Sequence, residues 1–121
     1  MNFREILMSL VNDVPGAHAA MIMAKDGIPL DEYRNPSLNG AIDLQSVGVE
    51  YSSLINEFRK NAQNLGVEGM DEVSVRGDQW TFLVRVVNDE YFLILALQSS
   101  GYFGKGRYLL RKASHQVRNQ L

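Results

Sequence analysis

The chain has 121 residues, of which 45% are hydrophobic and 21% are charged, and its formal net charge is −2. This length suits one domain over residues 1–121, and this composition is typical of a globular protein rather than a disordered chain. The small net charge argues against a dedicated nucleic-acid binder, and the absence of cysteine excludes disulfides, thiol nucleophiles and cysteine-ligated metals.

The first third of the chain predicts a helix and a hairpin. Apolar residues recur every three or four positions over residues 3–11, and Val14-Pro15-Gly16 ends this helix. Residues 17–24 are mostly small and apolar, which predicts a buried strand. The Asp26-Gly27 pair predicts a tight turn into a strand over residues 28–34. A proline in this returning strand places it at a sheet edge, because proline cannot donate a ladder hydrogen bond.

A loop and a longer helix follow. Residues 35–42 contain Asn-Pro and Asn-Gly pairs, which are typical of loops. Apolar residues at helical spacing predict a helix over residues 43–65, with Asp43 as its N-cap and Gly66 just past its C-terminus. The apolar arc of this helix is wide enough to contact both its own sheet and a neighbouring molecule.

The second half predicts three strands and a basic helix. The strands span residues 70–76, 79–87 and 91–97, and turn-forming residues separate them. The last two are apolar on both faces, so they should be central, with helices on both sides. The final helix begins at about Gly104, and its apolar side carries Leu110, Ala113, Val117 and Leu121.

These elements predict an α/β fold with the order α-β-β-α-β-β-β-α. The strands are joined by tight hairpins, so the five-stranded sheet should be antiparallel. Three helices cannot all lie on one face of so small a sheet. The sequence therefore predicts a three-layer α/β/α sandwich in which one helix is alone on its face.

Signatures of catalysis are weak throughout the chain. We expect His18 to be a core histidine with its hydrogen bond satisfied, and His115 to be a solvated helix residue. Asp31-Glu32 and Asp71-Glu72 are adjacent on strands, so the two carboxylates of each pair should point to opposite faces. The glycine-rich residues 101–107 match neither P-loop nor dinucleotide-binding spacing. We therefore expect no enzyme, no metal and no cofactor, and an interaction module instead.

Three local sequences resemble a known family. They are the helix end Val14-Pro15-Gly16-Ala17, the strand and turn over residues 19–30, and the helix start Gly104-Lys105-Gly106-Arg107-Tyr108-Leu109-Leu110-Arg111. With the order of elements, they resemble the Roadblock/dynein-light-chain family, most closely its prokaryotic MglB-like branch. The resemblance implies a profilin-like Roadblock fold and a homodimer, in which the third strands of two subunits pair and the long second helices lie side by side.

The resemblance also implies a function. MglB-like proteins bind a small Ras-like GTPase and stimulate its GTP hydrolysis, remodelling the GTPase rather than inserting an arginine finger. The GTPase would contact the outward side of the second helix, opposite its apolar arc. A helical wheel gives this side as Ser46, Val49, Ser53, Asn56, Lys60 and Asn64, of which only Val49 is apolar.

The same resemblance places the dimer interface on the second helix and the third strand. The expected interface residues are Leu54, Phe58, Val73 and Val75. Val73 and Val75 share one face of a strand that would be a free, aggregation-prone edge in a monomer. The apolar arc of the second helix could also pack only within its own chain.

Other functions stay open. The chain could be a dimeric Roadblock scaffold that binds another protein without changing GTP turnover, or a small-molecule sensor on a similar sandwich. Residues 91–121 hold five basic residues and no acidic one, whereas residues 1–90 hold all 14 acidic residues. This basic segment is a solvated helix face or a docking surface for an acidic partner rather than a nucleic-acid site. With neither a signal peptide nor an apolar span, we expect a cytoplasmic protein that does not insert into membranes.

Overall fold

The computed structural model describes residues 1–37, 42–67 and 69–121. Three helices are formed, namely α1 (Phe3–Asp13), α2 (Leu44–Asn64) and α3 (Phe103–Arg118). Five strands are formed, namely β1 (Ala17–Ala24), β2 (Pro29–Arg34), β3 (Glu72–Arg76), β4 (Trp80–Val86) and β5 (Tyr91–Gln98). The predicted order of elements is confirmed. Part of the predicted loop over residues 35–42 lies outside the described residues.

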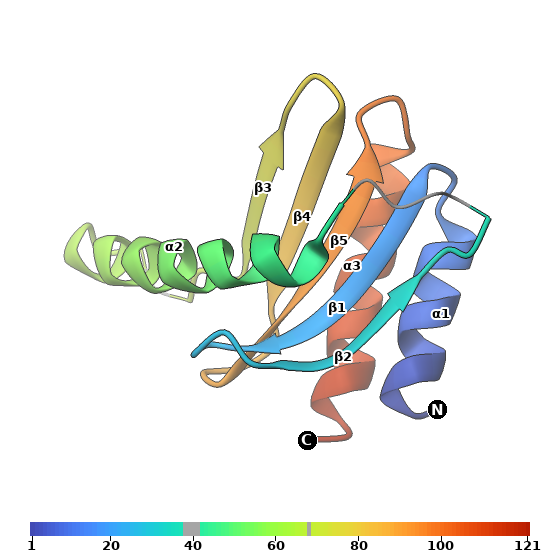
Figure 1. Ribbon diagram of the computed structural model, residues 1–121. Helices are drawn as coiled ribbons and strands as arrows, with labels where there is room; N and C mark the ends of the chain where they lie inside the picture. The colour runs from blue at the N-terminus through green and yellow to red at the C-terminus, as the bar shows by residue number, and fades with distance from the viewer. Residues whose placement is uncertain (38–41, 68) are drawn as a thin grey trace.

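The strands form one antiparallel sheet in the order β2-β1-β5-β4-β3. Helix α2 lies alone on one face, and α1 and α3 lie side by side on the other (Figure 1). The predicted three-layer sandwich is therefore confirmed. As the sequence indicated, β5 is central with β4 beside it, and the proline-containing β2 is at an edge.

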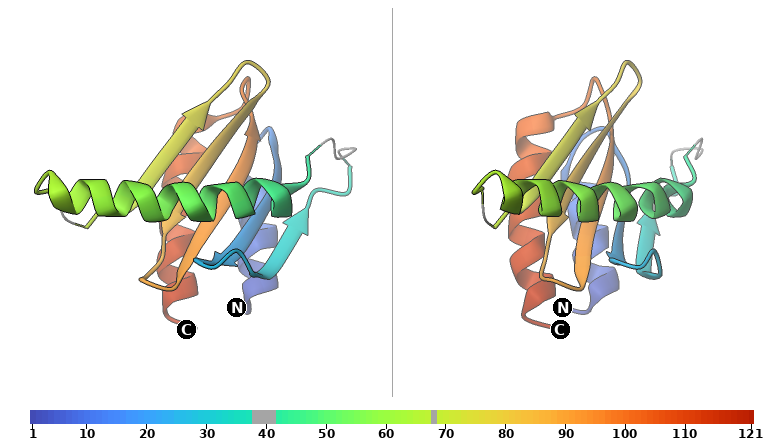
Figure 2. Two further views of the ribbon diagram at one scale, coloured as in Figure 1. Left: turned by 60° about the vertical axis from the view of Figure 1, so that its left-hand side comes forward. Right: turned by 90° about the vertical axis from the view of Figure 1, so that its left-hand side faces the viewer.

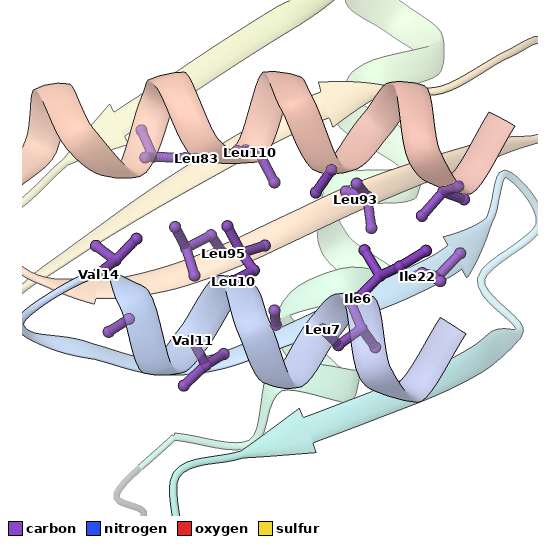
Figure 3. Packing of buried hydrophobic residues seen from close by; sticks show 14 of the residues in the cluster. Ile6, Leu7, Leu10, Val11, Val14, Ile22, Leu83, Leu93, Leu95 and Leu110 are labelled. Atoms are coloured by element: carbon purple, nitrogen blue, oxygen red, sulfur yellow. The ribbon is translucent and has the colours of Figure 1, made fainter. Parts of the chain in front are cut away.

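A separate apolar core fills each side of the sheet. The core under α1 and α3 is rich in leucine, valine and isoleucine (Figure 3). Gly106 lets α3 approach the sheet, because an added Cβ would lie only 3.3 Å from Leu83 Cδ1. The core under α2 contains Met21 and Met23, whose side chains come close to Gly48 of the helix.

Most predicted boundaries agree with the structure to within one residue, and two differ by more. The third strand begins at Glu72 rather than at residue 70, because Met70 packs against the core under α2 instead of joining the ladder. Leu121 does not share the apolar side of α3, which ends at Arg118. The chain makes a turn over residues 118–121. Leu121 therefore does not continue the helix, and its side chain is half exposed.

Helix α2 is longer than the part of the sheet that it covers. It crosses the strands, and its C-terminal end projects beyond β3 (Figure 2). Both ends of the helix are well defined, since Asp43 accepts a hydrogen bond from the Ser46 N–H and Gly66 has a φ of 76°. Because β3 is the last strand of the sheet, the projecting end is not supported by the sheet. No helix in the described part of the chain is long and apolar enough to cross a bilayer.

Candidate functional site

The side of α2 that faces away from the sheet is exposed along its whole length. We call it the outer face of α2, and it consists of the six predicted contact residues Ser46, Val49, Ser53, Asn56, Lys60 and Asn64. Val49 is 52% exposed on this otherwise polar face. Exposure of an apolar side chain to water is unfavourable in the free protein, and exposed apolar residues are often found in contact surfaces.

Two residues of the outer face also have structural roles. The Ser46 hydroxyl donates to Asp43 Oδ2 at 2.7 Å, and this bond together with the Ser46 N–H lowers the pKa of the Asp43 carboxyl. Asn56 Nδ2 donates to the carbonyl oxygen of Lys25 at 3.4 Å, which ties α2 to the β1–β2 hairpin. Ser46 and Asn56 therefore shape the helix as well as facing solvent, whereas Val49 has no such polar function.

The turn of the β1–β2 hairpin lies next to Val49. Gly27 has a φ of 92°, and a Cβ built on it would lie 3.7 Å from Val49 Cγ2. Ile28, the next residue of the turn, is 60% exposed. Sequence reasoning did not select Ile28, because it was assigned to a strand; its position just after a positive-φ glycine was the available signal.

A second exposed surface lies along the flank of α2 that faces the β3–β4 hairpin. Leu54 and Phe58, two of the predicted interface residues, are 44% and 42% exposed on this flank. Tyr51, one helical turn before Leu54 and two before Phe58, is buried, with its ring against that of Phe82 at a centroid distance of 5.7 Å. Burial also raises the pKa of the Tyr51 hydroxyl above its ordinary value.

The two predicted interface residues of β3 differ in burial. Val73 is half-buried and packs against the core under α2, and Val75 is 46% exposed on the same face. Val75 lines an open groove of about 500 Å³ together with Tyr51, Phe82 and the residues of the β3–β4 turn. The outer edge of β3 carries no further strand of the described chain. The structure thus brings all four predicted interface residues to one side of the molecule.

The residues considered for catalysis do not form a site. His18 lies on β1 with its ring edge-on to that of Trp80, 4.5 Å between centroids. Its Nε2 has no hydrogen-bond partner among the described residues, so the prediction of a satisfied core histidine is wrong in that respect. The aromatic neighbour offers no acceptor, and burial lowers the pKa of His18. His115 is exposed, as predicted.

The glycine-rich segment before the last helix has a packing role. Gly101 lies against Gly16, where an added Cβ would be 2.8 Å from Gly101 Cα. Residues 103–107 already belong to α3, so they form no free loop around a phosphate. Among the described residues, no three histidine, aspartate or glutamate side chains come together as metal ligands.

Comparison with known proteins identifies the family. The Roadblock/LC7 domain model matches residues 4–98, which is most of the chain. The chain belongs to the Roadblock/LC7 family. The resemblance seen in the sequence is therefore confirmed, and this family is one of regulatory and adaptor domains. No match is found among curated protein sequences.

Solved structures agree with this assignment. MglC from Myxococcus xanthus is 40% identical over the whole of both chains, with a TM-score of 0.71. MglB from Thermus thermophilus is 17% identical, with a TM-score of 0.87 over 95% of this chain and 84% of that one. Profilin II from Acanthamoeba castellanii is 12% identical over 98% of both chains, with a TM-score of 0.57. The last two structures are too different in sequence to show more than a shared fold, whereas MglC is similar to this chain in sequence as well as in fold.

Proposed function

We propose that the protein works as a homodimer joined through the flank of α2 and the outer edge of β3. Leu54, Phe58 and Val75 leave a large apolar area in water in the single chain, which is unfavourable unless another molecule covers it. The outer edge of β3 also favours a contact, because its unpaired backbone N–H and C=O groups can form hydrogen bonds with another strand. Both features lie on one side of the molecule and can be covered by one contact.

The shape of the chain supports a two-fold arrangement. In such an interface the same surface serves both copies, so a projection on one copy must meet a recess on the other. The projecting end of α2 (Figure 2) can serve as the projection, and the groove beside Tyr51 and Val75 can serve as the recess. If the β3 strands pair across the dyad, the α2 end of each copy extends over the sheet of the other.

We further propose that this homodimer binds a small Ras-like GTPase with the outer face of α2 and regulates it. The observation that carries this proposal is the membership of the Roadblock/LC7 family, whose MglB-like branch was recognised in the sequence. The exposed Val49 supports it, because the outer face keeps an apolar side chain that is 52% exposed to solvent. In the homodimer the two outer faces lie on the same side and form one extended surface.

An adaptor that leaves GTP turnover unchanged is the second candidate. The observation that favours it is the identity of 40% with MglC against 17% with MglB. Stimulation of hydrolysis was implied by resemblance to the MglB-like branch in particular. A sequence that is more similar to MglC than to this MglB weakens the argument for stimulation and leaves the argument for binding intact.

One experiment separates these functions. The purified protein is added to a small Ras-like GTPase from the same source, and phosphate release is measured beside binding of the GTP-loaded form. Faster release identifies a GTPase activator. Binding without faster release identifies an adaptor. Absence of binding to every such GTPase of that source would overturn the proposed partner.

A further inference from the structure

A basic groove lies on the face of the sheet opposite α2. It has a volume of about 380 Å³ and runs between α3 and the strands β3 and β4. Three arginines line it, Arg85 from β4 and Arg107 and Arg111 from successive turns of α3. The only acidic side chain among the lining residues is that of Glu72 on β3. The groove therefore has an excess of positive charge although the whole chain is slightly acidic.

The Glu72 carboxylate neutralises part of this positive charge by pairing with two of the arginines. Arg107 Nε and Nη2 donate to its two oxygens at 2.7 Å each, and Arg85 Nη1 lies 3.8 Å from Oε1. Arg85 also pairs with Asp71 at 3.2 Å. Arg111, by contrast, makes no ion pair with any residue of the described chain. One guanidinium of the groove is thus available beside an internal ion pair that already shows how the groove holds a carboxylate.

The remaining lining is aromatic and open. Tyr108 is 66% exposed, and the ring of Phe103 lies under the guanidinium of Arg76 at 5.0 Å. The groove is also open at Gly104, because a Cβ built there would meet no atom within 4 Å. Arginine forks match carboxylates, and the exposed ring of Tyr108 provides apolar contact area next to them, whereas Phe103 is partly buried against the core.

We propose that this groove binds an acidic, aromatic-containing peptide segment of a partner protein, whose carboxylates contact Arg111 and compete with Glu72 for Arg107. A polyphosphate chain fits less well, because it cannot use the apolar contact area that the aromatic ring of Tyr108 offers beside the arginines. This inference does not depend on the proposed GTPase, since α3, which lines the groove, and α2 lie on opposite faces of the sheet (Figure 1). Glu72 belongs to β3, whose outer edge is part of the proposed homodimer interface.

The first test uses a fluorescent peptide of alternating glutamate and tyrosine, with a glutamine-tyrosine peptide as control. Fluorescence anisotropy should show binding of the glutamate peptide only. Arg111→Gln should weaken it about tenfold, the loss expected for one charge-assisted hydrogen bond. Lys112→Gln is the matched control, because Lys112 follows on the same helix but lines a different hollow, next to α1. Equal effects of the two variants would overturn the proposal.

The second test removes the charge of Glu72, the carboxylate that competes with the peptide for Arg107. Glu72→Gln removes the negative charge that occupies Arg107 and Arg85, so the folded variant should bind the glutamate peptide more tightly than the wild type. Unchanged or weaker binding by a variant with a wild-type circular dichroism spectrum would contradict the proposed competition. Tighter binding of a single-stranded oligonucleotide than of the peptide, lost in Arg111→Gln, would replace the proposed peptide by nucleic acid. The exposed Arg111 keeps the first test independent of any folding defect at Glu72.

Discussion

The rings of Tyr51 and Phe82 meet edge to face, with 5.7 Å between their centroids and an angle of 62° between their planes. This pair holds α2 against β4, the strand next to the edge strand β3. Leu54, one helical turn further, and Phe58, two turns further, have no such aromatic partner among the described residues and remain exposed. The apolar surface proposed to join two copies therefore lies directly beside a contact that holds α2 on its own sheet.

The outer face of α2 is tested with Val49→Asp. A buried carboxylate in a contact surface is unfavourable, so binding of the GTP-loaded GTPase should weaken about tenfold or more. Because Val49 is exposed, the variant should keep its thermal stability. Met8→Asp is a suitable control, since Met8 is an exposed apolar residue on α1, across the sheet. Wild-type affinity of a folded Val49→Asp protein would exclude Val49 from the contact.

The contact between the two glycines Gly16 and Gly101 predicts a large cost for Gly16→Ala. Alanine at Gly66 has only to adopt a positive φ in open space, which costs about 1–2 kcal/mol. Alanine at Gly16 has the same strain, and its Cβ would also lie 2.8 Å from Gly101 Cα. Urea titration should therefore show Gly16→Ala to be less stable than Gly66→Ala by about 1–3 kcal/mol. Equal stabilities would show that the two segments separate at little cost.

The Glu72–Arg107 pair predicts a pH dependence of stability. The hydrogen bond from Arg107 holds the pKa of Glu72 below its ordinary value. A carboxyl with a lowered folded-state pKa adds stability above its unfolded pKa of about 4.3, and this is lost as the pH falls through the folded value. Wild type should thus be only slightly more stable than Glu72→Gln at pH 7, because Arg107 is exposed and solvent screens the pair.

The measurement is the difference in unfolding free energy between the two proteins across pH. This difference should shrink steadily below about pH 4.3, where Glu72 becomes protonated in the unfolded chain. A difference that stays constant down to the acid transition would show that the ion pair contributes nothing to stability.

Local signals in the sequence were sufficient to predict how the helices and strands are layered in the fold. Pro29 placed its strand at an edge, and the Asp26-Gly27 pair placed the first hairpin, because each has a specific backbone effect. The apolar residues of β4 and β5 indicated helices on both faces. The exposure of Val49 followed from the helical period alone.

Contacts between distant segments could not be predicted in the same way. Glu72 and Arg107 are 35 positions apart, and no periodicity relates an edge strand to the last helix. The lack of a partner for His18 Nε2 depends on Trp80, which comes from another strand. The groove beside Tyr51 likewise requires knowing where α2 crosses the sheet. Such features arise from tertiary packing, so they become visible only in the folded structure.

The most direct test of the proposed homodimer is the mass of wild type and Leu54→Glu in solution, measured by light scattering. Wild type should have the mass of two chains, and Leu54→Glu should have that of one, 13.6 kDa, with an unchanged circular dichroism spectrum. Ser53→Glu, the adjacent position on the outer face, should remain a dimer. A single-chain mass for wild type, or a folded Leu54→Glu protein with the mass of two chains, would contradict the account.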